Sequence, residues 1–251
     1  MKVATIYGAS HGLGLATAKH LVDDGFTVEL VGRDFALAQE TFAATEVADR
    51  QVKFIRHDLL ADDLSDLFAK VAQKPLAVFY TAGIGRLQPF SDTDTSYVHA
   101  CYAINAEIPT VLIKKHYGAL CGQDAFYLGC VTSIAGQIVS PLFSVYAASK
   151  AAASRLIESV NIELMATGSR NRITDFCPGN FSGSSFSGDD TDLPKLAELS
   201  GQLIETTFSR AGLFIPDYET IYKSVIERYR NDFEAFGLSS YEYKMKRSQF
   251  K

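Results

Sequence analysis

The chain has 251 residues, 47% of them hydrophobic and 21% charged, a composition typical of a globular protein that folds as one domain. At this length most of the unfolded surface can be buried, so neither a disulfide framework nor a structural metal is needed for stability. The net charge of −5 excludes a strongly basic surface. We therefore expect a small-molecule partner rather than nucleic acid or an anionic membrane.

Cysteine and histidine spacing indicates neither disulfides nor a metal site. No C-x-x-C or H-x-x-x-H pair occurs, and the cysteines lie mostly in apolar runs, which predicts core thiols in a reducing compartment. The start of the chain enters a short apolar run without a signal-peptide pattern, and no apolar run reaches membrane-spanning length. The expected location is the cytoplasm.

A glycine-rich turn follows the first apolar run, residues 3–7, and precedes a segment with helical apolar spacing. Its glycines follow the pattern G-x-x-x-G-x-G, not the commoner G-x-G-x-x-G. Glycines at such a turn let the backbone approach a phosphate and direct free N–H groups toward it. The turn can be merely structural, but its place between a strand and a helix favours nucleotide binding. The predicted binding residues here are Gly8, Ser10, His11, Gly12, Leu13 and Gly14.

The end of the second predicted strand, residues 26–31, bears on the choice of nucleotide. An acidic residue near this point usually binds the ribose 2′-hydroxyl, whereas an arginine accommodates a 2′-phosphate. Arg33 comes before Asp34, which favours NADP over NAD. Asp34 is the counter-evidence, although it is equally suited to cap the following helix. His11 would either assist at the same phosphate or face solvent.

Strands and helices alternate along the rest of the chain, which predicts an α/β fold with a doubly wound parallel sheet in a single domain. The later strands are expected at 52–56, 76–80, 125–131 and 173–177, and the helices at 61–72, 92–116 and 143–167. Residues that follow strand ends should meet at one edge of the sheet, where ligands bind. Those predicted to contact the cofactor are Asp58, Leu59, Ala82, Gly83, Pro178 and Gly179.

The stretch VTSIAGQIVSPLFSVYAASK, residues 131–150, carries the outline of a proton-transfer site. Tyr146 and Lys150 are one helical turn apart, so the ammonium should lower the pKa of the phenol. Ser133 follows a strand and would hydrogen-bond the same substrate oxygen. A Tyr-x-x-x-Lys pair alone is weak evidence, because both residue types are common in the chain. No G-x-S-x-G surrounds Ser133, which argues against a serine hydrolase.

The last third of the chain has a different composition. Residues 180–194 are rich in Gly, Ser and Asp, which predicts a substrate lid at about 180–215. Phe181, Phe186, Leu193, Phe208 and Phe214 would give it an apolar inner face. Apolar spacing over 218–236 predicts one helix used for core packing, and the basic end from residue 241 is expected to be a solvated tail.

Taken together, these residues resemble the short-chain dehydrogenase/reductase family over nearly the whole chain. The motifs that carry the resemblance are Gly8/Gly12/Gly14, Asp58, Asn105, Ser133, Tyr146, Lys150 and Pro178-Gly179. The resemblance implies a Rossmann-type domain that binds a nicotinamide cofactor. It also implies a catalytic tetrad in which Tyr146 is the general acid/base and Ser133 polarises the carbonyl. Lys150 would bind the nicotinamide ribose and tune Tyr146, and Asn105 would position a water.

The chain departs from the family pattern at several positions. Tyr7 stands where threonine is usual, Tyr80-Thr81 replace two asparagines, and Gly183 replaces a threonine that contacts the nicotinamide carboxamide; Ser182 or Ser184 would have to substitute. No terminal Gly-Gly strand is evident. The expected assembly is therefore a homodimer through the long helices at 92–116 and 143–167, with a tetramer as the alternative.

The function expected from these features is NADP(H)-dependent reduction of a carbonyl group, or oxidation of the corresponding alcohol. The alternative is a non-catalytic NADP(H)-binding sensor or scaffold of the same fold. A sugar-nucleotide epimerase or dehydratase would need a longer carboxyl-terminal segment. Leu87, Phe90, Leu142 and Phe143 favour a partly apolar substrate, while Arg86, Lys195 and Arg210 leave a phosphorylated or carboxylated one open.

Overall fold

The computed structural model describes residues 2–43, 51–183 and 190–247. All seven strands of its one sheet are parallel, in the order β3-β2-β1-β4-β5-β6-β7. The strands are β1 (Val3–Tyr7), β2 (Thr27–Gly32), β3 (Val52–Arg56), β4 (Ala77–Tyr80), β5 (Tyr127–Val131), β6 (Ile173–Phe176) and β7 (Leu213–Phe214). The chain runs outward from β1 to β3 and then returns to β4 on the other side of β1. A crevice at the carboxyl ends of β1 and β4 follows from this reversal.

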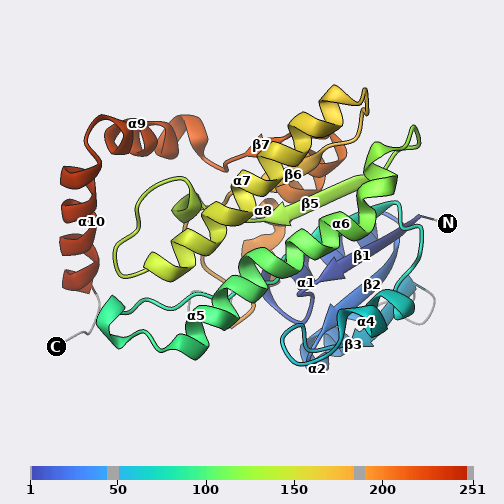
Figure 1. The fold of residues 1–251 in the computed structure, drawn as a ribbon. Coiled ribbons are helices and arrows are strands. Elements are labelled where there is room, and N and C mark those ends of the chain that lie inside the picture. Colours follow the sequence, from blue (N-terminus) through green and yellow to red (C-terminus); the bar gives the residue numbers. More distant parts are fainter. Residues whose placement is uncertain (1, 44–50, 184–189, 248–251) are drawn as a thin grey trace.

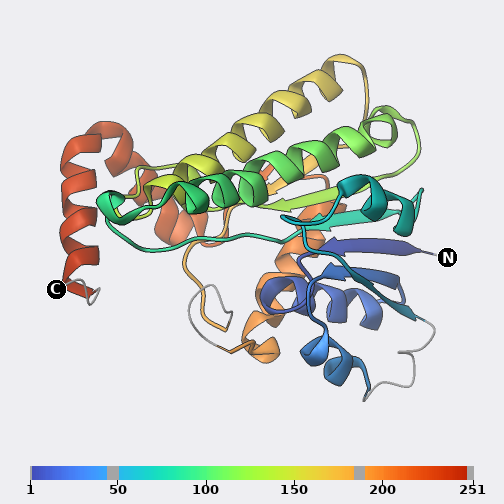
Figure 2. The same ribbon diagram turned by 60° about the horizontal axis from the view of Figure 1, so that its bottom comes forward.

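Helices cover both faces of the sheet, as predicted (Figures 1 and 2). One face carries α1 (Gly12–Asp23), α2 (Ala36–Ala43) and α8 (Leu193–Phe208), which pack on a core that includes Leu15, Phe42 and Leu203. The other carries α4 (Leu64–Lys70), α6 (Ile108–Cys121) and α7 (Ser144–Ala166), whose core includes Leu67, Leu112 and Ile157. Apolar side chains on both sides of β1 and β4 explain why these strands read as continuous hydrophobic runs.

One predicted helix is divided in the structure, and one short strand was not predicted. The single helix expected at 92–116 is instead a 3₁₀ turn η1 (Phe90–Asp92), α5 (Thr95–Tyr102), a π-helical turn η2 (Ala103–Glu107) and α6. A wide turn inside a continuous helical pattern leaves no mark in apolar spacing. The short β7 was not predicted, because two residues are too few to show alternation.

The carboxyl-terminal prediction was wrong in two respects. The stripe at 218–236 is broken into a π-helical turn η5 (Tyr218–Tyr222), α9 (Lys223–Asn231) and the start of α10 (Phe233–Arg247), with Asp232 extended between the last two. The expected solvated tail from residue 241 continues α10 as far as Arg247 and is tied to the loop before α7, since Lys244 Nζ donates hydrogen bonds to Ser140 Oγ and Pro141 O at 2.7 and 2.9 Å.

Within the described ranges, every helix is too short or too polar to cross a lipid bilayer. The predicted lid begins beside this core: Phe181, Leu193, Phe208 and Phe214 pack against the α1–α8 side of the sheet. Phe186 and Ser184 lie outside the described residues. Movement of the segment at 180–215 as a lid stays a prediction.

Candidate active site

A cavity of about 660 Å³ opens at the carboxyl ends of the parallel strands. Of the residues predicted for the site, those lining it are Gly8, Ser10, His11, Gly12, Leu13, Gly14, Arg33, Asp58, Leu59, Ala82, Gly83, Ser133, Tyr146, Lys150, Pro178 and Gly179. Leu87, Phe143 and Phe181 also line it, whereas Arg86, Lys195 and Arg210 are engaged elsewhere with Asp94, Asp192 and the Tyr127 ring. The topology thus brings strand ends far apart in sequence to one crevice.

The glycine turn after β1 is shaped by two close backbone approaches. Gly8 and Gly12 have φ angles of +88° and +57°, which side-chain-bearing residues rarely adopt. A Cβ on Gly8 would lie 2.5 Å from the Ala82 nitrogen, and one on Gly14 would lie 2.3 Å from the Gly8 oxygen. Gly12 begins α1, and its N–H donates to Thr191 Oγ1 at 2.9 Å. In the protein alone this amide is therefore engaged by a hydroxyl, and an anionic ligand oxygen would accept its hydrogen bond in place of Thr191.

Arg33 follows the end of β2 and lines the cavity, as predicted, and the neighbouring Asp34 carboxylate is hydrogen-bonded within its own loop. Asp34 Oδ1 accepts the N–H of Ala36 at 3.0 Å, a hydrogen bond that lowers the pKa of the Asp34 carboxyl. Arg56, at the end of β3, is a residue that the sequence reasoning missed. Its Nε donates to the Arg33 carbonyl at 2.9 Å, so the Arg56 side chain lies against the main chain of Arg33. Its place as the last residue of the predicted strand 52–56 is the signal that could have suggested it, and the observed register pairs it with Gly32.

Asn105 does not line the cavity but lies behind it, inside the π-helical turn η2. Its side chain accepts the N–H of Ile84 at 3.0 Å and donates to the Ile84 carbonyl at 2.8 Å and to Ser149 Oγ at 3.0 Å. The amide thus fixes the segment after β4 against α7. A Cβ on Gly83 would lie 3.3 Å from Lys150 Nζ and 3.5 Å from Asn105 Oδ1, so Gly83 lies directly against both groups.

Tyr7 in β1 and Tyr80 in β4, which depart from the family pattern, pack in the same core cluster as Ile104 of the π-helical turn η2. The Tyr80 hydroxyl donates to the Ile104 carbonyl at 2.6 Å, and Thr81 Oγ1 donates to the Tyr7 carbonyl at 2.8 Å. Among the described residues no hydrogen-bond partner faces the buried Tyr7 hydroxyl. Tyr80 and Thr81, which replace the family's two asparagines, therefore form hydrogen bonds that link β4 to η2 and the end of β4 to β1.

Ser133, Tyr146 and Lys150 meet where β5 ends and α7 begins. The Ser133 hydroxyl accepts the N–H of Ala135 at 3.1 Å and is also hydrogen-bonded to Tyr146. Lys150 Nζ donates to the Val131 carbonyl at 2.9 Å and lies 5.9 Å from the centroid of the Tyr146 ring. Because Tyr146 and Lys150 are one turn apart on α7, both face the end of β5.

Burial dominates the protonation of this pair. It raises the pKa of Tyr146 to about 12, against the lowering effect of the Ser133 hydrogen bond, and it lowers the pKa of Lys150 to about 8. The prediction that Lys150 brings the Tyr146 pKa down is therefore wrong for the protein alone. Desolvation of the phenolate outweighs the hydrogen bond with Ser133, and the Lys150 ammonium is held by the Val131 carbonyl.

A buried carboxyl behind Lys150 was also missed. Asp175 on β6 is 4% exposed, and its Oδ1 accepts hydrogen bonds from Thr132 Oγ1 and, at 3.3 Å, from Cys177 Sγ. Burial raises the pKa of Asp175, while Lys150 acts in the opposite direction. Asp175, Cys130 and Cys177 in turn favour the charged form of Lys150. The sequence places Asp175 inside an apolar strand, which is the signal that could have found it.

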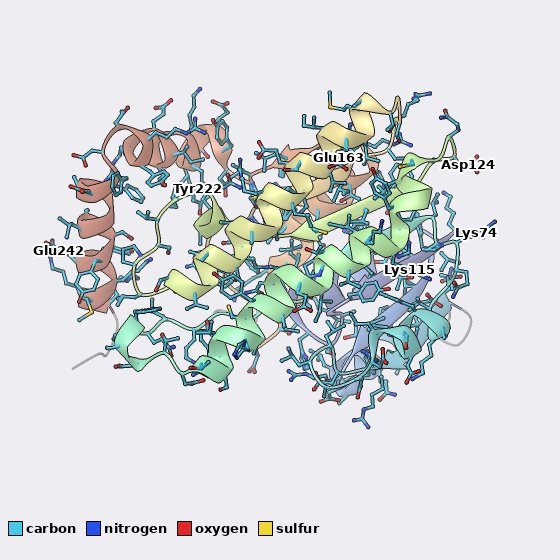
Figure 3. All side chains as sticks on the ribbon, in the orientation of Figure 1. Lys74, Lys115, Asp124, Glu163, Tyr222 and Glu242 are labelled. Carbon is cyan, nitrogen blue, oxygen red and sulfur yellow. The ribbon has the colours of Figure 1, made fainter. Side chains whose placement is uncertain are left out.

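The carboxyl-terminal segment forms a wall of the cavity that the sequence reasoning did not anticipate. Tyr222, Ser240, Tyr243 and Lys244 all line the cavity. Figure 3 shows Tyr222 where the chain leads into α9, and its hydroxyl lies against Gly179, since a Cβ there would be 1.5 Å from Tyr222 Oη. The glycine of Pro178-Gly179 therefore makes room for a tyrosine from a distant segment.

Comparisons with known proteins agree with this geometry. A family model described as short chain dehydrogenase matches residues 2–192. The chain is similar to a short chain dehydrogenase/reductase of Claviceps purpurea, with 30% identity over 207 residues that cover 77% of this chain and 70% of that protein. It is also similar to an oxidoreductase of Staphylococcus saprophyticus, with 26% identity over 185 residues covering 71% of this chain and 77% of that protein.

Solved structures share the fold. A short chain dehydrogenase of Burkholderia cenocepacia in complex with NADP superposes with a TM-score of 0.74 at 22% identity, covering 96% of this chain and 99% of that one. A short chain dehydrogenase/reductase of Burkholderia phymatum in complex with NAD gives 0.78 at 18%, covering 93% and 94%. The family model spans most of the chain, and the sheet order and crevice agree with it. The chain belongs to the short-chain dehydrogenase/reductase family.

Proposed function

We propose that this protein is an NADP(H)-dependent oxidoreductase that interconverts a carbonyl group and the corresponding alcohol on a small molecule. The observation that carries the proposal is the shared cavity: the glycine turn lies at one part of its wall and Ser133, Tyr146 and Lys150 at another. A dinucleotide held at the turn would reach the proton donors. Family membership supports oxidoreductase chemistry of this kind.

The residues present fit a nicotinamide dinucleotide. The close-packed glycines and the Gly12 amide suit its phosphates, and Asp58, Leu59, Ala82 and Gly83 line the wall on the way to Lys150. NADP(H), when bound, supplies the hydride chemistry. Arg33, with Arg56 and His11 nearby, would bind the 2′-phosphate, and the engagement of Asp34 with Ala36 supports NADP over NAD. The NADP complex of the Burkholderia cenocepacia relative is in keeping with this choice.

In the proposed reaction, side chains of the protein bind the substrate oxygen and transfer the proton to it. Ser133 would hydrogen-bond the carbonyl oxygen, and Tyr146 would transfer its phenolic proton to that oxygen during reduction. Lys150 would bind the ribose next to the reacting ring, and its charge would stabilise the phenolate that reduction leaves behind. Asn105 would act from behind: it fixes Ile84 and η2, and there we propose that it positions a water for reprotonation of Tyr146.

Titration of the purified protein with NADPH and NADH, followed by NADPH oxidation against ketones, aldehydes, quinones and keto-sugars, tests the proposal. We expect tighter binding of NADPH and turnover of at least one carbonyl class. Tight binding without turnover on a widened panel would favour the alternative, a non-catalytic NADP(H)-binding sensor. Failure to bind either nucleotide would contradict both.

A further inference from the structure

A tyrosine from the last part of the chain enters the cavity beside the proposed proton donors. Tyr222, the last residue of η5, lines the same cavity as Ser133 and Tyr146. Its ring packs against a buried apolar cluster that includes Ile134. Ile134 directly follows Ser133 and begins the short turn η3 (Ile134–Gly136), near which Figure 3 shows Tyr222. The ring is therefore held next to the segment that carries Ser133.

The Tyr222 hydroxyl is held where the chain leaves β6. A Cβ on Gly179 would lie 1.5 Å from Tyr222 Oη, so any larger residue there would displace the tyrosine side chain. The Asn180 N–H donates a hydrogen bond to the same hydroxyl oxygen. The Pro178 carbonyl accepts the N–H of Ile134 at 3.0 Å, which ties this strand end to η3. The hydroxyl therefore has a defined position at the cavity wall.

The proton of this hydroxyl is available to a ligand. Within residues 2–43, 51–183 and 190–247, Tyr222 Oη accepts the Asn180 hydrogen bond and donates none. Burial raises the pKa of Tyr222, against the lowering effect of the Asn180 hydrogen bond, so the hydroxyl stays protonated at neutral pH. A phenol has one donor site, and a partly enclosed donor gains free energy when an acceptor reaches it. An oxygen of a bound small molecule would be such an acceptor.

We propose that Tyr222 is a specificity-determining residue that donates a hydrogen bond to a second oxygen of the substrate. The preferred substrates are then diketones and hydroxyketones rather than ketones with a single oxygen. Ser133 and Tyr146 bind the reacting oxygen, and Tyr222 binds the other oxygen from the Gly179 side of the cavity. This inference rests on the proposed function for the reaction itself, but the contact with the second oxygen depends on Tyr222.

Matched ketones test this contact. The ketone 2-hexanone is compared with 2,3-hexanedione and 2,5-hexanedione, which place a second oxygen at two distances from the first. The proteins are the wild type, Tyr222→Phe and, as a control, Tyr218→Phe, which removes a hydroxyl from an exposed residue of η5 outside the cavity. We expect Tyr222→Phe to raise KM for the dione that the wild type prefers at least about fivefold, the loss of one neutral hydrogen bond, and KM for 2-hexanone less than about twofold. Tyr218→Phe should behave as wild type.

Other roles of the hydroxyl give different patterns. If it only fastens η5 to Asn180, Tyr222→Phe changes KM for 2-hexanone and for the diones by the same factor, and the proposal is overturned. It is also overturned if the variant loses NADPH affinity while KM for every ketone stays at the wild-type value, because the hydroxyl then serves the cofactor. Wild-type kinetics of Tyr222→Phe on all three ketones would overturn it as well.

A binding measurement separates this inference from the proposed function. The alcohols 2,5-hexanediol and 2-hexanol are titrated into the NADPH-bound protein, in which neither can be oxidised, and the nucleotide fluorescence is recorded. If Tyr222→Phe weakens binding of the diol at least about fivefold and of 2-hexanol less than about twofold, the contact is supported even without carbonyl turnover. In that case the proposed reaction fails alone. Equal changes for the two alcohols with normal carbonyl turnover reject the contact and leave the reaction intact.

Discussion

Burial shifts the pKa values of Tyr146 and Lys150 in opposite directions, because each loses hydration of its charged form. With its pKa raised to about 12, the phenol stays protonated at neutral pH, the form that reduction needs. Alcohol oxidation needs the phenolate instead, and its rate should climb as the pH rises. Lys150, with its pKa lowered to about 8, is the group whose charge would ease that step, and Asp175 behind it favours the charged form.

Tyr146→Phe removes the transferable proton and keeps the ring. We expect turnover to fall by at least about a hundredfold, as loss of general acid catalysis implies, with NADPH affinity nearly unchanged. Steady-state kinetics and nucleotide titration measure the two quantities separately. Turnover close to that of the wild type would mean that another group donates the proton.

Arg33→Ala removes the cation proposed to bind the 2′-phosphate. Its dissociation constant for NADPH should rise by roughly ten- to a hundredfold, while that for NADH should change little, since NADH has no phosphate there. Arg230→Ala on α9, which removes the same charge outside the cavity, serves as the control. Equal losses for both nucleotides would show that Arg33 supports the fold of the turn.

Helices and strands could be predicted from the sequence where a local pattern of apolar residues and glycines encodes them. Glycines between an apolar run and a helical stretch, and alternating strands and helices, are enough to place β1 to β6 and to bring Gly8, Ser133 and Tyr146 to one edge. The role of Arg56 was missed because its contact with Arg33 depends on the register between β2 and β3. Tyr222 was missed because it contacts Gly179 from a segment far along the sequence. No periodicity reports such contacts. The Tyr146 pKa was misjudged because spacing gives proximity but not desolvation.

The break at Asp232 offers a direct test of α10 as a separable wall. A chain ending at Asn231 loses the α10 residues that line the cavity but none that is fully buried. Its Tm should stay within about 5 °C of the wild type, because little apolar area leaves the core. NADPH affinity should also persist, whereas KM for the carbonyl substrate should rise at least about tenfold. A chain that no longer folds would show that α10 belongs to the core.

For the whole molecule, the exposed surface of the long helices bears on assembly. Ile162 and Met165 on α7 are 60% and 55% exposed in the single chain. They lie on one of the two long helices that were predicted to pair in a homodimer. The dimer stays a prediction, and the mass in solution decides it.

His116 makes global stability depend on pH. It is buried on α6 against Phe126, with ring centroids 5.3 Å apart, and burial lowers its pKa to about 4 from an ordinary 6.5. Between those values the unfolded chain binds a proton that the folded chain does not, so the free energy of unfolding falls as the pH drops from about 6.5 toward 4. The loss attributable to this group is roughly 3 kcal/mol.

The difference between wild type and His116→Leu isolates that contribution from the carboxylates. Urea unfolding at several pH values should give a difference that is constant above about pH 7 and shifts in favour of the variant in acid. A difference that does not vary with pH would mean that His116 titrates normally in the folded protein.

The hydrogen bond from the Gly12 amide to Thr191 Oγ1 links α1 to the segment just before α8. A phosphate oxygen that takes this amide must first displace the protein's own hydroxyl. The measured nucleotide affinity is then the outcome of a competition between two acceptors, one tethered at high effective concentration and the other supplied by solution. Association should accordingly be slower than simple encounter, with the stretch around Thr191 released whenever the cofactor arrives.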